Sequence, residues 1–207
     1  MVGRLTVEVL DGARERLHAI AAEYVRGLPG LRYCDIRVEV RQEKGAAAEN
    51  GHEKASSEDA TLAFGVRAIS GDGATAPGYY GRILGDEDAL RLEAVVRQGV
   101  RHAHQRALAS ARQKAEARSR YGALAESLTN TLLASVPVVR DTVPPVYAID
   151  PRSVKLTDVT RMALDGCKAA AAVSSQIVYS VAYTRTSLIR ELFLSSEGSD
   201  IEQSFAL

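Results

Sequence analysis

The chain has 207 residues, of which 46% are hydrophobic and 25% are charged, as is ordinary for a soluble globular protein of one or two domains. Its 26 lysines and arginines balance its 26 aspartates and glutamates, so the charge gives no reason to expect nucleic acid or an anionic membrane as a partner. No signal peptide is recognisable, and no apolar run approaches the ~18 residues of a membrane span, so a cytoplasmic location is expected.

The first part of the chain predicts a helix followed by a strand. An apolar stripe at spacings of three and four runs over residues 6–26, and Gly27 with Pro29-Gly30 ends it. Residues 33–41 then alternate between apolar and polar, which predicts a strand with one buried face. Residues 44–57 offer little to bury, so we expect a mobile hairpin or loop there, with Asn50-Gly51 as its turn.

The stretch over residues 59–84 predicts a β-hairpin at the centre of a sheet. Residues 60–70 alternate at period two, the turn 70–73 contains two glycines, and residues 78–84 return as a second strand. Gly65 in the middle of the first strand indicates a close approach of backbone. Arg67 shares its face, so we expect Arg67 to lie over Gly65 and to meet a carboxylate.

A long helix and an extended connector follow the hairpin. Asp86-Glu87-Asp88 suits the first turn of a helix, which continues to a break near residues 119–122. After this break a strong apolar stripe at helical spacing is restored by Tyr121, Leu124, Leu128 and Leu132. Four prolines lie within residues 136–151, which therefore predict an extended connector.

The last part of the chain follows the same order as the first. A helix is expected around residues 159–173, with strands over 176–185 and 188–195, a turn at 196–198 and a further strand from Ile201. This order leaves open a repeated helix-strand-strand unit. Because the alternation is still running at Leu207, we also expect a truncated chain whose complete protein is longer.

The predicted fold class is therefore α+β, a mostly antiparallel sheet covered by helices. We divide the chain into an N-terminal part (1–135) with the first helix, the central sheet and the long helix, the proline-rich connector (136–151), and a helix with a hairpin (152–207). Cys34 and Cys167 stand among apolar neighbours and are expected to be buried free thiols, although a disulfide is also compatible with the sequence.

Several short segments, in this order, resemble one protein family. They are Tyr-Cys-Asp-Ile-Arg-Val-Glu (33–39), Phe-Gly-Val-Arg-Ala (64–68), Gly-Tyr-Tyr-Gly (78–81), Asp-Pro-Arg-Ser-Val-Lys-Leu (150–156), and Ser-Ser-Glu-Gly (195–198) with Glu202-Gln203. Together with the opening helix they are similar to the N-terminal half of the TldD/PmbA family, the "modulator of DNA gyrase" proteins, across almost the whole chain.

The resemblance implies a mixed α/β N-terminal region and, in active subunits, a C-terminal region with an HExxxH zinc site completed by a cysteine. It also implies a metallopeptidase that acts on unfolded or modified peptides, as a dimer in which one subunit type can lack the metal motif. We therefore expect this chain to be a non-catalytic N-terminal region that contributes to dimerisation, as a homodimer or with a paired subunit, and to a substrate cavity. The alternative is a stand-alone binding or scaffold module of a metal-free family member.

The sequence departs from the family in having no HExxxH motif, so zinc is expected only beyond Leu207. His52-Glu53 begins like the motif, but no second histidine follows at the required spacing. His102 and His104 are two residues apart on a predicted helix and point ~200° apart, so they are expected to be solvated or at an interface and not to share a metal. His18 is expected at the surface.

Other motifs have simpler explanations than chemistry. Gly71-Asp72-Gly73 lacks the residues of a phosphate loop and predicts a turn. The serine pairs 174–175 and 195–196 have no glycine elbow and no partnered histidine. The arginines between Arg97 and Arg120 predict a solvated helix face. No catalytic, cofactor-binding or metal-binding residue is therefore assigned in this chain.

Overall fold

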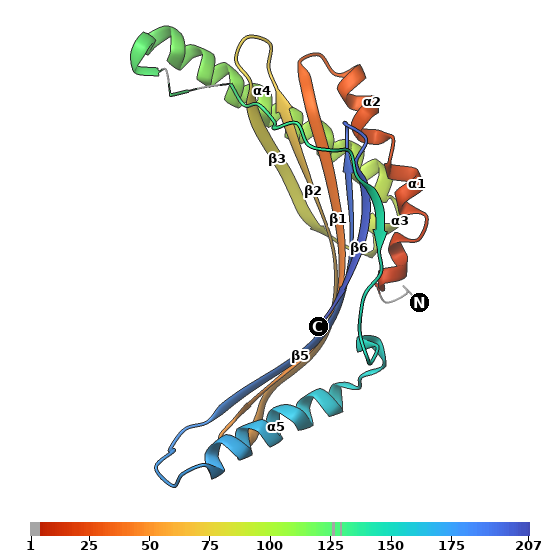
Figure 1. The fold of residues 1–207 in the computed structure, drawn as a ribbon, viewed down its shortest axis with the longest axis vertical. Coiled ribbons are helices and arrows are strands. Elements are labelled where there is room, and N and C mark those ends of the chain that lie inside the picture. Colours follow the sequence, from red (N-terminus) through yellow and green to blue (C-terminus); the bar gives the residue numbers. More distant parts are fainter. Residues whose placement is uncertain (1–4, 126, 129) are drawn as a thin grey trace.

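A computed structural model describes residues 5–125, 127–128 and 130–207. Its frame is one six-stranded sheet in the order β3-β2-β1-β5-β6-β4, in which every neighbouring pair is antiparallel except β4 and β6. Figure 1 shows the sheet as a long curved blade with helices along one side. The predicted α+β class is confirmed. The strands are β1 (Leu31–Glu49), β2 (His52–Ser70), β3 (Ala76–Leu84), β4 (Arg140–Val143), β5 (Val181–Ser195) and β6 (Asp200–Ala206).

The segment expected to be a mobile hairpin or loop is a hairpin formed by the two longest strands. β1 and β2 pair along their whole lengths, so residues 44–57 are strand on both sides of the turn. The Asn50-Gly51 turn itself is confirmed, and both residues have positive φ, of 50° and 78°. The hairpin alternative is therefore confirmed. Its strands were expected to offer little to bury, but they have a helix to pack against: Ala46 and Ala48 are buried under Val159, Ala163 and Cys167.

The centre of the sheet also differs from the expectation. The predicted hairpin of β2 and β3 is present, but β3 is an edge strand, and β1 pairs with β5 in the middle. The two strands expected over 176–185 and 188–195 are one strand, β5, because its pairing with β1 continues without interruption from Val181 to Ser195. The turn at 196–198 and the strand that follows it, β6, are as predicted.

The helices all lie on one face of the sheet. They are α1 (Ala13–Leu17), α2 (Ile20–Gly27), α3 (Asp86–Leu90), α4 (Leu92–Tyr121) and α5 (Leu156–Ala172), with short 3-10 turns at Val7–Leu10, Gly122–Ala125 and Pro151–Ser153. Two buried clusters fill the space beneath them. The larger contains Ile36, Val38 and Val40 of β1 with α1, α2 and α4, and the smaller contains Ala46 and Ala48 with α5. Since all these β1 residues have even numbers, they point to the same side.

Two predicted helices are interrupted. The first is split into a 3-10 turn, α1 and α2, and Gly12 at the first break has a left-handed φ of 65°. The second is split at Arg91 into α3 and α4, and α4 ends at Tyr121, where the break was expected. The helical stripe expected after it is wrong, because a 3-10 turn over Gly122–Ala125 follows and residues 127–128 and 130–139 contain no helix. Within the described residues, no helix is both long and apolar enough to cross a membrane.

The connector is mostly extended, as its prolines predict, but part of it joins the sheet. Residues 140–143 form β4, which pairs in parallel with β6. Arg14 of α1 donates from Nε to Asp200 Oδ1 at 2.7 Å and from Nη1 to Thr142 Oγ1 at 2.7 Å, and so ties the first helix to both strands.

Cys34 and Cys167 are buried free thiols, as expected, and burial raises the pKa of Cys34 to about 12.

His104 is buried within the chain, contrary to the solvated or interface position expected for it. Its Nδ1 lies 2.8 Å from Ser70 Oγ, and both residues are buried between α4 and β2. Burial lowers the pKa of His104 below its ordinary value of 6.5. The folded chain therefore holds this imidazole neutral at a pH where the unfolded chain protonates it.

Stability is therefore expected to fall as the pH drops below about 6.5, because protonation of His104 favours the unfolded state. Urea unfolding at several pH values between ~7 and ~5.5 measures this loss, and a His104→Gln variant should show a flatter profile over the same range. His18→Gln is the control, since His18 is exposed. Equal slopes for wild type and His104→Gln would contradict the assignment.

Candidate functional site: the concave face of the sheet

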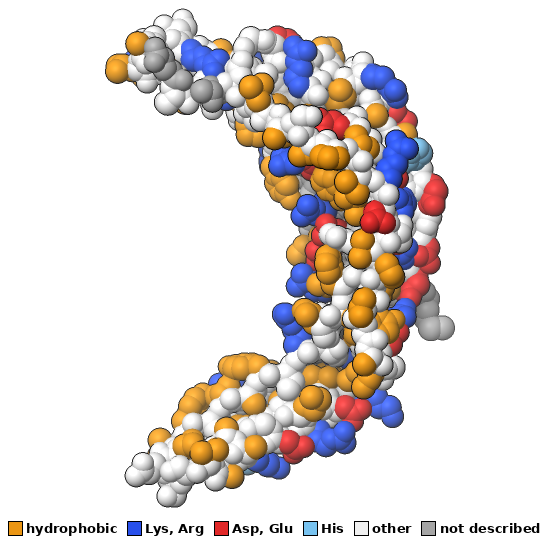
Figure 2. All heavy atoms as spheres, viewed as in Figure 1, with side chains coloured by type: hydrophobic (Ala, Val, Ile, Leu, Met, Phe, Trp, Pro, Cys, Tyr) orange, Lys and Arg blue, Asp and Glu red, His pale blue; other side chains and the backbone are white. Residues whose placement is uncertain are grey.

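The face of the sheet opposite the helices carries no helix in the described residues and lies on the inner side of the curve. Figure 2 shows this hollow, with lysine, arginine and apolar side chains along it. Odd-numbered residues of β1, β2 and β5 point to this face, because the even-numbered ones are buried under the helices. We call it the concave face. Its geometry makes it the candidate functional surface.

One ion pair on the concave face joins β1 and β2. Asp35 and Arg67 are directly opposite. Arg67 Nε donates to Asp35 Oδ2 at 2.7 Å, and Arg67 Nη2 lies 2.7 Å from the same oxygen in an ion pair. The carboxylate is buried, with 11% of its side chain exposed, whereas the guanidinium is 49% exposed. The guanidinium also lies 5.8 Å from the centre of the Tyr33 ring. Burial, helped by the neighbouring Asp35, raises the pKa of Tyr33 to about 12.

A second pair repeats this arrangement between β1 and β5. Arg37 lies 3.3 Å from the carboxylate of Glu191 and 5.7 Å from the centre of the Phe193 ring. Glu191 also accepts a hydrogen bond from Gln203 of β6 at 3.3 Å. The exposed fractions are again unequal, 58% for the arginine side chain and 11% for the carboxylate. In both pairs a buried carboxylate and an aromatic ring hold an arginine whose remaining N–H groups face the hollow.

Beside Arg37 and Arg67 the surface of the concave face is formed by glycine residues. Gly65 of β2 is opposite Arg37 on one side and Gly81 of β3 on the other. A Cβ atom on Gly65 would lie 2.2 Å from the Tyr79 hydroxyl, so the Tyr79 side chain covers this position. The expected carboxylate partner of Arg67 is confirmed. The side chain over Gly65 is nevertheless Tyr79 and not Arg67, and the close approach there is made by a side chain, not by backbone.

Apolar side chains border this polar centre on both sides. On β3, Tyr79 is 61% exposed and Ile83 is 71% exposed. On the other side, Ile189 of β5 is opposite Phe205 of β6, which is 46% exposed. The concave face therefore offers fixed hydrogen-bond donors in its middle and apolar contacts at its margins. This combination suits an extended chain with both polar backbone and apolar side chains.

The histidines do not come together. His52 is exposed beside the β1–β2 turn, His18 is exposed on the N-terminal helical segment, and His102 stacks on Tyr80 with 4.8 Å between ring centres. His104 lies on the buried side of α4 with Ser70. In residues 5–125, 127–128 and 130–207, no group of three or more histidine, cysteine, aspartate or glutamate side chains is arranged to hold a metal ion. The side chains of the described residues therefore do not fit a zinc site.

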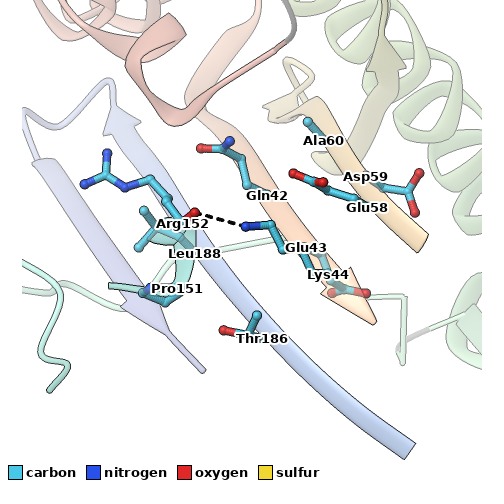
Figure 3. A pocket seen from close by; sticks show the side chains of 10 residues that line it. All are labelled: Gln42, Glu43, Lys44, Glu58, Asp59, Ala60, Pro151, Arg152, Thr186 and Leu188. Atoms are coloured by element: carbon cyan, nitrogen blue, oxygen red, sulfur yellow. Dashed lines mark hydrogen bonds between the residues drawn. The ribbon is translucent and has the colours of Figure 1, made fainter. Parts of the chain in front are cut away.

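A smaller cavity of about 60 Å³ lies on the helix-bearing face, in the gap between the N-terminal helices and α5. Figure 3 shows its lining, with Lys44 reaching from β1 to the connector. The Lys44 ammonium donates to the carbonyls of Arg152 at 3.0 Å and of Val154 at 2.5 Å. Arg152 in turn pairs with Asp150 and Glu8. These hydrogen bonds and ion pairs give Lys44 and Arg152 a structural role, in which they join the N-terminal helices to the segment that leads into α5.

The arginines of α4 also bind other segments of the chain through ion pairs and hydrogen bonds. Arg97 pairs with Glu23 and Glu93, Arg106 donates to the carbonyl of Tyr79 at 2.8 Å, and Arg118 donates to the carbonyl of Leu128. The prediction of a purely solvated face was therefore incomplete.

The concave face, in contrast, is not predicted as a site by the sequence analysis. The signal that could have found it is the alternation of Tyr33, Asp35 and Arg37, which places aromatic and charged side chains on one face.

Comparison with solved structures gives matches to one group of proteins. A "putative modulator of DNA gyrase" from Bacteroides thetaiotaomicron superposes with a TM-score of 0.56 at 14% identity, over 95% of this chain and 39% of its own length. TldE from Thermococcus kodakarensis superposes with a TM-score of 0.53 at 13% identity, over 89% of this chain and 36% of its own length.

This chain spans a little over a third of the length of both proteins. The sequence matches no protein-family model and no curated protein. Identities this low establish shared fold and not shared activity. The chain therefore has the fold of a part of TldE and of the modulator-of-DNA-gyrase proteins, as its resemblance to the TldD/PmbA family implied.

Proposed function

We propose that this chain is the non-catalytic region of a cytoplasmic TldD/PmbA-like metallopeptidase, where it forms one wall of the cavity that admits unfolded or modified peptides and pairs with a second subunit. The observation that carries the proposal is a helix-free concave face on a fold shared with TldE and the modulator-of-DNA-gyrase proteins. In this role the chain binds and positions peptide, and the proteolytic chemistry belongs to other parts of the protein.

The side chains of the concave face support peptide binding. Arg37 and Arg67 are held by buried carboxylates, so little side-chain entropy is lost when their outward N–H groups bind peptide carbonyls or carboxylates. Tyr79 and Ile83 supply exposed apolar area beside them. Because both arginines are already paired, the surface favours no strong net charge in its ligand. That property suits a protein that acts on peptides of varied sequence.

Peptide binding tests the proposal directly. A fluorescein-labelled unfolded peptide is titrated with the chain, and anisotropy gives the dissociation constant. Ile83→Asp should weaken binding at least ~10-fold, because it places a charge at the apolar margin of the concave face. Leu90→Asp is the matched control, since Leu90 is an equally exposed aliphatic residue on α3, at 88% against 71% for Ile83. Equal affinities for the two variants would contradict the proposed wall.

The chain by itself is expected to bind no stoichiometric zinc and to cleave no peptide. A hydrolytic zinc site needs three protein ligands and an open position for water, and the described residues bring no such set together. Elemental analysis of the purified chain after dialysis against zinc measures this. One tightly held zinc per chain that is lost in His52→Ala or His102→Ala would contradict the prediction.

A further inference from the structure

Two glycines lie side by side on the concave face and leave a space without side chains. Gly65 of β2 is directly opposite Gly81 of β3, in the pairing that joins residues 64–68 to residues 78–81. The neighbouring positions on the same face carry side chains, which are those of Arg37, Ala63, Arg67, Tyr79 and Ile83. The surface is therefore lower above the two glycines than around them, and we call this space the glycine slot.

The two glycines are needed for different reasons. A Cβ atom on Gly81 would lie 2.7 Å from the carbonyl oxygen of Phe64, so the close approach of the two strands excludes a larger residue there. For Gly65, the three atoms nearest to an added Cβ atom all belong to the Tyr79 side chain, and its φ is not positive. A glycine inside a strand weakens that strand. What Gly65 provides is room for an aromatic ring.

Tyr79 covers the glycine slot and is held there by contact alone. Its hydroxyl lies over Gly65, yet the residue is 61% exposed, so much of the ring surface is open to water. Arg106 fixes the backbone of Tyr79 by donating to its carbonyl at 2.8 Å. Within the described residues the Tyr79 side chain makes no hydrogen bond or ion pair. The ring can therefore rotate outward without losing a polar contact.

The arginines beside the glycine slot do not fill it. Arg67 is drawn toward β1 by Asp35, and Arg37 is drawn toward β5 by Glu191, so both guanidinium groups lean away from β3. Arg37 is on the strand next to Gly65, about 4.8 Å away. A peptide that is bound by the N–H groups of Arg37 therefore has side chains within reach of the slot.

We propose that the glycine slot takes one aromatic side chain of the bound peptide, and that Tyr79 is a movable cover which the incoming ring displaces. The chain's own tyrosine shows that a flat ring fits over these glycines. A ring that replaces it buries apolar area against the strand backbone, and the displaced Tyr79 can pack on the new ring as an aromatic pair. This inference rests on the proposed function and names the class of side chain that the concave face selects.

Selection of an aromatic ring suits a surface that binds unfolded chains. Large aromatic side chains are mostly buried in folded proteins, whereas in an unfolded peptide they are exposed and can enter the slot. The glycine slot therefore supplies a preference that the two paired arginines, which favour no net charge in the ligand, do not supply.

Two fluorescein-labelled peptides that differ only in phenylalanine or alanine at one central position test the slot by anisotropy. The measured quantity is the ratio of their dissociation constants, that of the alanine peptide over that of the phenylalanine peptide. Wild type should prefer the phenylalanine peptide. Tyr79→Ala should raise the ratio at least ~5-fold, because the ring then enters an uncovered slot. Tyr121→Ala is the matched control on α4, where the tyrosine is 52% exposed, and should keep the wild-type ratio.

Filling the slot is the second arm of this experiment. Gly65→Val in the Tyr79→Ala background places a side chain in the slot after its nearest neighbour has been removed, so the two peptides should bind equally. A ratio that does not rise in Tyr79→Ala, or a preference that survives the added valine, would overturn the slot. If neither peptide bound to wild type, the proposed function itself would fail, so the two failures are distinguishable.

Fluorescence tests the movement of the cover. The chain contains no tryptophan, so Tyr79→Trp introduces a single indole at the glycine slot. Its emission should shift to longer wavelength when the phenylalanine peptide saturates the chain, because the indole is displaced into water, whereas the alanine peptide should leave the emission unchanged. Circular dichroism checks that each variant is folded. Equal spectra with the two peptides would contradict the displacement of Tyr79.

Discussion

Replacing Gly78 by valine is expected to cost at least about 3 kcal/mol of folding free energy, the upper range for overpacking a close-packed site. Gly78 lies on β3 where α4 presses directly on the strand. A Cβ atom there would lie 2.2 Å from the Ala103 carbonyl oxygen and 2.3 Å from the Ala107 nitrogen. Both atoms belong to helix backbone, so relief requires the whole of α4 to move from the sheet. Urea denaturation measures the loss as a lower unfolding midpoint.

Two other glycines are matched controls for Gly78→Val. Gly27→Val should be nearly neutral, since no other part of the chain lies within 4 Å of its Cβ position. Gly65→Val should cost less than Gly78→Val, because the nearest atom is the hydroxyl of Tyr79, which is 61% exposed and free to rotate outward. If Gly65→Val were as unstable as Gly78→Val, Tyr79 would be packed over Gly65 as rigidly as α4 is packed over Gly78. That result would contradict the conclusion that the Tyr79 side chain can move aside.

The sequence predicted those elements whose signals are local. The turn at Asn50-Gly51, the β2–β3 hairpin, the extended connector and the last strand each depend on a few adjacent residues. For residues 44–57 the sequence left a hairpin and a loop as alternatives, because the strand pairing there depends on α5 packing over Ala46 and Ala48 from more than a hundred positions away. In isolation those alanines favour no strand, and tertiary contacts decide. The same holds for β5, whose length is set by pairing with β1.

The candidate site was predictable only in part, for a similar reason. Arg67 was expected to meet a carboxylate, since an arginine on a half-buried strand needs a partner, and Asp35 supplies it from the neighbouring strand. The pair of Arg37 with Glu191 depends on β1 and β5 lying side by side, which no local pattern indicates. The burial of His104 depends on which face of α4 meets the sheet. Its neighbours Ala103 and Ala107 are small enough to leave that face ambiguous in the sequence.

Replacing Arg67 by methionine is expected to destabilise the chain by about 3 kcal/mol, because it leaves the Asp35 carboxylate buried without its cation. Asp35 accepts a hydrogen bond from Arg67 Nε within this ion pair, and the Asp35 side chain is only 11% exposed, so water cannot fully replace the guanidinium. The reverse change, Asp35→Asn, should cost less, because the guanidinium it frees is 49% exposed and can be solvated. Thermal and urea unfolding of the two single variants measure this asymmetry.

The exposed pair of Arg32 with Asp72 is the matched control for Arg67→Met. Its atoms lie 3.2 Å apart and its side chains are 59% and 82% exposed, so Arg32→Met should change stability by no more than about 1 kcal/mol. The double variant Arg67→Met with Asp35→Asn should recover part of the loss of Arg67→Met, since it removes the buried charge along with its partner. If Arg67→Met and Arg32→Met proved equally mild, the buried carboxylate would not be held by Arg67, and the arginine would be free to move across the concave face.

Peptide affinity would then be insensitive to Asp35→Asn. With Arg67 fixed as the structure shows, the same substitution should weaken peptide binding, because the freed guanidinium loses the orientation that presents its N–H groups to the hollow.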